Sequence, residues 1–580
     1  MKFEVDRLAV FKDLKKYKKL IAFVLALTIA NAVGELFLPR LMSQIVDYGI
    51  VKNDVPYILK IGIAMLLVTL LTILVRGSAA YFSSKTAMLF SRDLRQNIFS
   101  KVNYMTFDDT EKFGISSLIT RTTNDVGNIE QLVLMSMRPL ARAPLMIIGG
   151  LVMALWTNVR LTLLTLCVLP ILMGILYFIL KRVVPAFPVL QRRLDRINLL
   201  FRQRLTGLQV IRAFSNDARE EAKFNEASQK HYQLSLKVNQ TLTTVRPIMR
   251  LFLNFAIIAV LYVGSRFIDT GHMHIGQLMA FIQYMTQMLT GFMMLSYMLT
   301  LLPRTTASIR RVEEVLDFPA HQTGGDQPLN EPIHSITAEH LSFTYPGAQQ
   351  PALDDLNFHI EAGETVGVIG GTGSGKSTLL KLLLQFYETT SGQLLINDMD
   401  INTIRTKDLR QRLSYVPQQS FFFTDTIRGN IQYSNPEASD EEMLDHLATA
   451  QVSSFIDVNN HESLDREIIR GGANYSGGQR QRLAIARTLA RNASVYLFDD
   501  SFSALDFRTD YYLRKELEEQ LADKMAIIVA QRVATIRHCD KIIVLDNGQM
   551  AGIGSHDELL KSNQIYHEIA VSQGEEEVVQ

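Results

Sequence analysis

Six long apolar segments in the first 320 residues constrain the fold of this 580-residue chain more than any other feature. A helix needs about 20 apolar residues to cross the hydrocarbon core of a bilayer. Because lipid offers the backbone no hydrogen-bonding partner, such segments must be helical. The six spans are predicted near 20–47, 56–82, 139–157, 160–181, 247–268 and 276–302. The sequence therefore predicts a polytopic α-helical membrane domain over residues 1–317.

The distribution of Lys and Arg predicts the orientation of this domain. The two long connections, 83–138 and 182–246, are rich in both residues, whereas the short loops on the other side hold few. By the positive-inside rule, the long connections and both termini lie in the cytosol. Apolar residues recur at spacings of three and four between Leu190 and Phe201, which indicates that helices continue beyond the membrane.

Beyond residue 332 the sequence changes to a soluble pattern in which strands and helices alternate. A linker with Gly and Pro is predicted at 318–332, followed by an α/β nucleotide-binding domain at 333–574 and an acidic tail at 575–580. The net charge of the whole chain is only +1. Nucleic acid is therefore not expected as a partner, because phosphate contacts require a basic excess.

A glycine-rich loop is the strongest motif of this second half. The apolar run 365–369 predicts a buried strand, and the pattern G-x-x-x-x-G-K-S follows it directly and opens an apolar helix. Backbone N–H groups of such a loop wrap phosphates, the lysine reaches the β- and γ-phosphates, and the serine hydroxyl ligates Mg²⁺. The predicted nucleotide-binding residues are Gly370, Gly371, Thr372, Gly373, Ser374, Gly375, Lys376, Ser377 and Thr378.

Two further motifs narrow the class of nucleotide-binding protein. The hydrophobic strand 495–499 ends in Asp499, a carboxylate suited to hold Mg²⁺ together with Ser377. Upstream, a helix opens on Ser476, Gly477, Gly478 and Gln479, and such a helix N-terminus is a second anion-binding site. A site in a separate helical lobe makes sense if it faces a nucleotide bound to another chain.

With these motifs the chain resembles the ATP-binding cassette (ABC) exporters, in the half-transporter layout of one six-helix membrane domain fused to one α/β P-loop ATPase domain. The resemblance implies ATP and Mg²⁺ as ligands. It also implies that Tyr345 stacks on adenine, that Gln418 ligates Mg²⁺, and that Asp506 lies in the loop between two ATP sites. The stretches near 113–119 and 213–219 resemble the coupling helices that press on the ATPase domains.

Two catalytic positions depart from the family pattern. Asp500 stands where the family has the Glu that polarises the attacking water, and Gln531 stands where it has a His at the γ-phosphate. The shorter Asp carboxylate stops about 1–1.5 Å short, and a misplacement of that size can lower a rate about a hundredfold. Gln donates a hydrogen bond but brings no charge to the transition state. Both changes predict a slow site, and the alternative is that Asp500 is an adequate base.

An intact Ser476–Gln479 element beside a weakened ATP site resembles the degenerate-site subunit of a bacterial heterodimeric multidrug exporter. The resemblance implies a second half-transporter with the consensus Glu and His as partner, and a place among the lipids of the plasma membrane. It implies export of a hydrophobic or amphipathic small molecule by alternating access. The alternatives are a lipid exporter, a homodimeric exporter and, more distantly, a nucleotide-gated regulator or channel.

Glu35 is the candidate substrate-binding residue of the membrane domain. It lies within the first predicted span, where a carboxylate costs about 2.5–3.5 kcal/mol on insertion scales and is therefore a functional candidate. Such a group would attract cationic amphiphiles. The alternative is an ion pair with Arg40 or Arg76.

Overall fold

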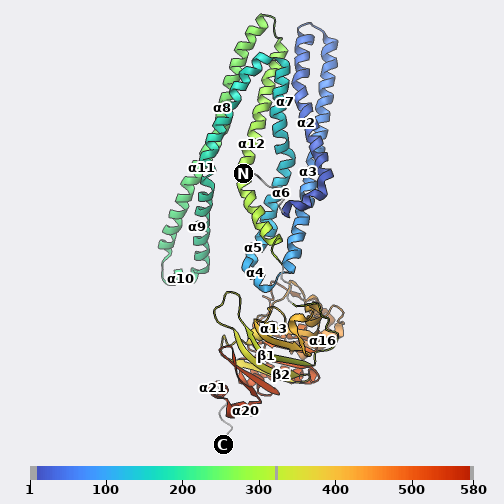
Figure 1. The fold of residues 1–580 in the computed structure, drawn as a ribbon, viewed down its shortest axis with the longest axis vertical. Coiled ribbons are helices and arrows are strands. Elements are labelled where there is room, and N and C mark those ends of the chain that lie inside the picture. The colour runs from blue at the N-terminus through green and yellow to red at the C-terminus, as the bar shows by residue number, and fades with distance from the viewer. Residues whose placement is uncertain (1–8, 320–323, 575–580) are drawn as a thin grey trace. The chain divides into compact units, whose positions relative to one another are not determined.

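The computed structural model describes residues 9–319 and 324–574, which form two compact units (Figure 1). The first unit runs to Asn103 and resumes from Ile115 to Pro319, and the second holds Tyr104–Gly114 and the chain beyond Pro319. The acidic tail predicted at 575–580 and residues 320–323 of the predicted linker lie outside the described residues.

The first unit is helical. Over the described residues, six of its helical segments are long and apolar enough to cross a membrane, as the sequence predicted. Its elements are α1 (Ala9–Lys12), η2 (Asp13–Tyr17), α2 (Lys18–Gln44), η3 (Ile45–Ile50), α3 (Val55–Asn103), α5 (Ile115–Thr120), η4 (Arg121–Asp125), α6 (Val126–Met135), η5 (Ser136–Leu140), α7 (Ala141–Thr157), α8 (Val159–Val183), α9 (Ala186–Thr206), α10 (Leu208–Ala213), α11 (Asp217–Asp269) and α12 (Ile275–Leu316).

The longest helices extend well past the hydrocarbon thickness. Helix α3 has 49 residues and α11 has 53. At about 1.5 Å per residue these helices are roughly 70–80 Å long, more than twice the apolar core of a bilayer. The helical periodicity within the connection 182–246 is thereby explained, because α9 and much of α11 lie in that stretch.

Close helix packing and an ion pair of the buried Asp125 join helices of the first unit. A Cβ on Gly150 of α7 would lie 2.7 Å from Cγ of Met288 on α12, so the missing side chain permits the close approach. Nearer the end of α12, the buried carboxylate of Asp125 accepts hydrogen bonds from Arg311 Nε at 2.7 Å and from Ser308 Oγ at 2.8 Å. These bonds fasten α12 to the segment that leads into α6.

The second unit is α/β and contains one short helix from the first half of the chain. Helix α4 (Phe107–Phe113) belongs to it, with the ring centroid of Phe107 4.5 Å from that of Phe386. This short helix precedes the coupling-helix stretch expected near 113–119. The short helix α10 likewise ends where the second stretch, expected near 213–219, begins.

The second unit contains two main sheets, with the strand orders β2-β1-β4-β5 and β12-β11-β3-β10-β9-β6, and the short ladder β7-β8. The strands are β1 (Ser335–Phe343), β2 (Leu353–Glu361), β3 (Thr365–Gly370), β4 (Ser391–Ile396), β5 (Met399–Asp400), β6 (Leu413–Val416), β7 (Asp425–Thr426), β8 (Glu467–Ile468), β9 (Val495–Asp499), β10 (Met525–Val529), β11 (Lys541–Asp546) and β12 (Gln549–Gly554). The helices include α13 (Lys376–Leu383), α14 (Thr406–Arg412), α15 (Ile427–Gln432), α16 (Asp440–Thr449), α17 (Gly477–Leu489), α18 (Phe507–Gln520), α19 (Val533–Ile536), α20 (His556–Ser562) and α21 (Gln564–Ser572).

Parallel pairing positions the candidate site. Strands β11, β3, β10, β9 and β6 pair in parallel, so their carboxyl ends lie at one edge of the sheet. Ligands of open α/β sheets bind outside such an edge. The segments that begin there follow Gly370, Asp499, Val529 and Val416, and they carry the motifs that the sequence singled out.

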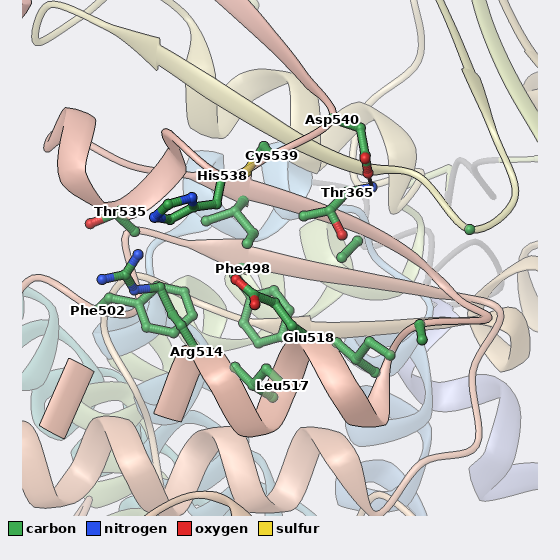
Figure 2. Close-up of a pocket in the computed structure, with 15 residues that line it drawn as sticks. Thr365, Phe498, Phe502, Arg514, Leu517, Glu518, Thr535, His538, Cys539 and Asp540 are labelled. Atoms are coloured by element: carbon green, nitrogen blue, oxygen red, sulfur yellow. Dashed lines mark hydrogen bonds between the residues drawn. The ribbon is translucent and has the colours of Figure 1, made fainter. Parts of the chain in front are cut away.

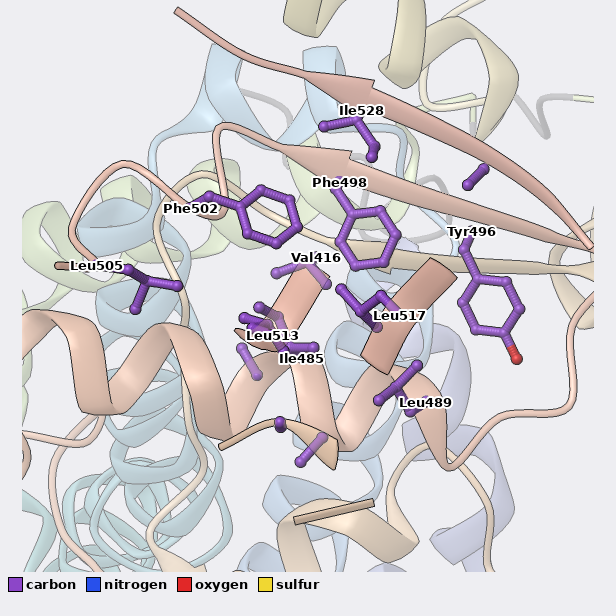
Figure 3. Packing of buried hydrophobic residues seen from close by; sticks show 14 of the residues in the cluster. Val416, Ile485, Leu489, Tyr496, Phe498, Phe502, Leu505, Leu513, Leu517 and Ile528 are labelled. Carbon is purple, nitrogen blue, oxygen red and sulfur yellow. The ribbon is translucent and has the colours of Figure 1, made fainter. Parts of the chain in front are cut away.

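Apolar side chains from α17 and α18 cover one face of this sheet (Figure 3). Leu513 and Leu517 of α18 and Ile485 of α17 pack in one cluster with Phe498 and Ile528 of the strands. All five are buried. The cluster fixes the helices that flank the site, so the geometry at the sheet edge depends on it.

A test of this packing compares two adjacent residues of α18 that differ in burial. Leu513 is completely buried, whereas Tyr512 is 46% exposed. We expect Leu513→Ala to cost about 2–5 kcal/mol, because a cavity remains, and Tyr512→Ala to cost less than about 1 kcal/mol. Thermal unfolding of the purified chain in lipid measures both. Equal shifts of the two unfolding midpoints would contradict the packing described.

Candidate nucleotide-binding site

The loop between β3 and α13 has a backbone that requires glycine. Gly373 and Gly375 adopt positive φ angles of 84° and 96°. A Cβ on Gly375 would lie 2.5 Å from the carbonyl oxygen of Ala352, so a larger residue would also clash. Helix α13 begins at the next residue, which presents the loop and the helix N-terminus together, as an anion site needs.

The ammonium group of Lys376 turns back into this loop. Its Nζ donates to the carbonyl oxygens of Gly370 at 2.8 Å and Gly371 at 2.7 Å. Burial lowers the pKa of Lys376, and the carboxylates of Asp500 and Asp499 oppose that shift. A phosphate bound in the loop would be within reach of a charged donor that the fold already holds in place.

Ser377 and Asp499, both predicted to hold Mg²⁺, are in direct contact. The Ser377 hydroxyl donates to Asp499 Oδ1 at 2.7 Å. Tyr415, which the sequence analysis missed, donates from its hydroxyl to Asp499 Oδ2 at 3.2 Å. Burial raises the pKa of Asp499, and the two hydroxyl donors oppose the rise. Hydroxyl and carboxylate oxygens are the ligands Mg²⁺ prefers, so this pair fits the ion that the motif implies.

Asp500 and Gln531, the two departures from the family pattern, also contact each other. Asp500 Oδ2 accepts hydrogen bonds from Gln531 Nε2 at 2.8 Å and from Gln418 Nε2 at 3.3 Å. The carboxylate is therefore held between two neutral amides. Asp500 is 9% exposed and has a positive φ of 49°, a conformation that its buried surroundings impose.

Tyr345 lies beside the helix that follows the loop. Its hydroxyl is 3.1 Å from Thr378 Oγ1, and Lys381 Nζ lies 5.7 Å from its ring centroid. Tyr387 packs edge-on against the ring at a centroid distance of 5.2 Å. The side chain of Tyr345 is half-buried, so part of it remains accessible.

The Ser476–Gln479 element begins α17 as a capping box. Ser476 Oγ accepts from the Gln479 N–H at 3.3 Å, and Gln479 Oε1 accepts from the Ser476 N–H at 2.9 Å. Ser476 and Gly477 are exposed. The predicted inter-site residue, Asp506, caps α18 by accepting from the Thr509 N–H at 3.1 Å. Hydrogen bonds from the side chain and the backbone of Thr509 lower the pKa of the Asp506 carboxyl.

One buried amide joins these two elements to Asp500. Gln481 Oε1 accepts from the Ala504 N–H at 3.1 Å, and its Nε2 lies 3.5 Å from the carbonyl oxygen of Asp500. Gln481 was not recognised from the sequence because it lies two residues beyond the motif. A glutamine two positions after Gln479 is the signal that the sequence offers.

A second concave site lies between the sheet and α18 (Figure 2). It encloses about 240 Å³, with the rings of Phe498 and Phe502 and the polar side chains of Arg514 and Glu518 in its wall. None of the predicted nucleotide-binding residues lines it. It is therefore distinct from the site at the sheet edge.

In the first unit, Glu35 is paired rather than free. Its carboxylate accepts a hydrogen bond from Arg142 of α7, and its backbone oxygen accepts one from Gln287 of α12 at 3.1 Å. The ion pair expected as the alternative is present, but Arg40 and Arg76 were the wrong partners. The guanidinium of Arg40 instead lies 5.1 Å from the ring centroid of Trp156.

Comparison with known proteins gives a family match in each half of the chain. Residues 21–292 match the family described as ABC transporter transmembrane region, and residues 353–503 match the family described as ABC transporter. An uncharacterized ABC transporter ATP-binding protein of Mycobacterium tuberculosis is 36% identical over 569 residues, which are 97% of each chain.

Two further relatives are informative. The ATP-dependent lipid A-core flippase 1 of Colwellia psychrerythraea is 30% identical over 488 residues, covering 82% of this chain and 81% of the flippase. The structure of a bacterial Atm1-family ABC exporter with ATP bound aligns with a TM-score of 0.79, covering 97% of this chain and 99% of that one. Its sequence identity is 24%, so this likeness concerns the fold.

The position of Lys376 leads to a direct test of the site. We expect Lys376→Ala to weaken ATP binding by at least about tenfold, because a charged hydrogen bond to phosphate is worth roughly 1.5–3 kcal/mol. Lys407→Ala, which removes an exposed lysine of α14, is the matched control. Equilibrium dialysis with ATP measures both variants. Binding by Lys376→Ala within twofold of the control would argue against nucleotide in this loop.

Proposed function

The chain belongs to the ABC transporters, and on this basis we propose that it exports hydrophobic or amphipathic compounds as the degenerate-site subunit of a heterodimer. Its second half is a transport ATPase domain, and its first half crosses the membrane. We propose three properties: slow ATP hydrolysis at its own site, a second half-transporter as partner, and a hydrophobic or amphipathic substrate.

The contact among Asp500, Gln418 and Gln531 carries the proposal. A general base must reach the attacking water and accept a proton from it. Here the carboxylate is one methylene shorter than the consensus Glu, and two amides already occupy Oδ2. Neither amide can supply positive charge to the transition state. The three groups together are suited to hold a nucleotide and poorly suited to hydrolyse it.

The other residues have roles in binding. Lys376 and the loop amides would hold the phosphates of ATP, and Tyr345 would stack on the adenine ring. Ser377, Asp499 and Gln418 would hold Mg²⁺, which neutralises phosphate charge when bound. Tyr415 keeps the Asp499 carboxylate oriented through its hydrogen bond. Asp500 would orient water at the γ-phosphate, with Gln531 as a neutral donor beside it.

Exposed surfaces support a second chain as partner. Ser476 and Gly477 present a helix N-terminus to solvent. In the first unit, Val210 of α10 is 61% exposed and Phe214, which follows this helix, is 74% exposed. Exposed apolar side chains at the tip of a long helical hairpin are what a docking element needs. A partner half-transporter would cover them, and its consensus Glu and His would act at the site completed by Ser476–Gln479.

The substrate class rests on the membrane unit and on the relatives. The pairing of Glu35 with Arg142 places both signs of charge within the helical bundle. An amphipathic cation would have to compete with Arg142 for the carboxylate, and an anionic headgroup would compete for the guanidinium. Because one relative is described as a lipid A-core flippase, a lipid is the second candidate.

Restoring the consensus residues tests the proposed weakness of the site. We expect Asp500→Glu with Gln531→His to raise Mg-ATP turnover of the chain alone by at least about tenfold, since a carboxylate moved by about 1 Å and a charged donor each change rates by that order. Released phosphate is measured in lipid, with Lys376→Ala as the inactive control. An unchanged rate would show that these two residues do not limit hydrolysis.

Transport in inverted vesicles tests the substrate class. We expect ATP-dependent accumulation of an amphipathic cationic dye against its gradient once the partner chain is present, because alternating access couples closure of the ATPase domains to translocation. Movement of a labelled phospholipid without dye accumulation would favour the lipid alternative. Dye movement that only equalises concentrations would indicate a channel.

A further inference from the structure

The segment from Gln531 to Ile536 is held in place by the end of the chain. Helix α19 starts at Val533, and its first N–H groups need partners from outside the helix. Within the described residues, the side chain of the N-cap residue Arg532 makes no capping hydrogen bond. The partner comes from Gln573, forty residues further along the chain.

Gln573 contacts the backbone of this segment on both sides of Arg532. Its Oε1 accepts from the Val533 N–H at 2.8 Å, and its Nε2 donates to the carbonyl oxygen of Gln531 at 2.8 Å. One side-chain amide therefore satisfies a donor and an acceptor two residues apart, as a neighbouring strand would. Two such bonds restrict both the position and the rotation of residue 531.

The helix that carries Gln573 is itself firmly packed. Tyr566 and Ala570 of α21 are 0% and 1% exposed and belong to the main apolar cluster of the second unit. The Tyr566 hydroxyl lies 2.7 Å from His556 Nδ1 of α20. Gln573 directly follows α21, so its amide is presented from a rigid support rather than from a free end.

Helix α18 holds the same segment from another side. Arg514 Nη1 donates to the carbonyl oxygen of Ala534 at 2.8 Å, and the guanidinium of Arg532 lies 5.6 Å from the ring centroid of Phe507. Arg514 and Thr535 both line the pocket of Figure 2. The segment thus has two anchors, of which only Gln573 contacts residue 531 itself.

We infer that Gln573 is a positioning residue of the ATP site, which sets the place of residue 531 against Asp500 through the backbone. The Gln531 side chain donates to Asp500 Oδ2 at 2.8 Å, so displacement of its carbonyl also displaces that donor. Because both hydrogen bonds of the Gln573 amide within residues 9–319 and 324–574 go to backbone atoms, the same control acts whether position 531 carries Gln or His. This inference rests on the proposed role of residue 531 at the ATP site.

Three variants separate positioning from simple helix capping. Gln573→Ala removes both hydrogen bonds. Gln573→Glu keeps an acceptor for the Val533 N–H but cannot donate to the Gln531 carbonyl. Gln564→Ala is the matched control, since Gln564 is an exposed glutamine at the start of α21 whose amide donates to Glu568 at 2.9 Å.

Mg-ATP turnover of the full chain in lipid is measured in the native background and with Asp500→Glu and Gln531→His. In the faster background we expect Gln573→Ala and Gln573→Glu each to lower kcat about tenfold with KM changed less than twofold, and Gln564→Ala to change neither. Rapid ATP hydrolysis in the native background would contradict the proposed weak site. The Gln573 variants are then compared in the native background.

Two results would overturn the inference. One is turnover by both Gln573 variants at the rate of Gln564→Ala, and the other is full rescue by Gln573→Glu, which would reduce Gln573 to a helix cap. Hydrogen exchange at the Val533 amide provides a measurement independent of turnover. The exchange rate is expected to rise in Gln573→Ala and to stay low in Gln573→Glu. An unchanged rate in Gln573→Ala would show that the hydrogen bond from Val533 N–H to Gln573 does not form in solution.

Discussion

Parallel pairing of β10 between β3 and β9 is the constraint on which the rest of the ATPase half depends. It places Val529, the last residue of β10, beside Val368 of β3 and Asp499 of β9, so the three strands end close to one another. The glycine loop, the Asp499–Asp500 pair and the segment that begins at Gln531 therefore emerge at one edge. A shift of one residue in either ladder would move every side chain of that strand to the other face.

Much of this site could be predicted from the sequence, because short motifs carry their own geometry. The loop before Lys376 needs positive φ angles that favour glycine, and Asp499 ends an apolar strand whose composition predicts its burial. The six spans could also be predicted, because a helix that crosses a bilayer needs a long apolar segment. Motif spacing along the chain was enough in each of these cases.

The residues that the sequence did not reveal act through tertiary contacts. Tyr415 and Gln573 touch the site from β6 and from beyond α21, and nothing in their local sequence marks them. Arg142 could not be recognised as the partner of Glu35, because pairing between spans depends on helix rotation and tilt rather than on hydropathy. Side chains with ordinary local patterns acquire roles only when packing brings distant elements together.

The proposed ATP site combines nucleotide binding with slow hydrolysis. Its most direct test is to load the chain, purified alone in lipid, with labelled Mg-ATP and to follow both the bound nucleotide and its hydrolysis. We predict that ATP binds, that Lys376→Ala weakens the binding by at least about tenfold, and that the nucleotide is recovered mainly as ATP over many minutes. Rapid conversion to ADP with repeated turnover would contradict it, and a working homodimer would then be the better description of this exporter.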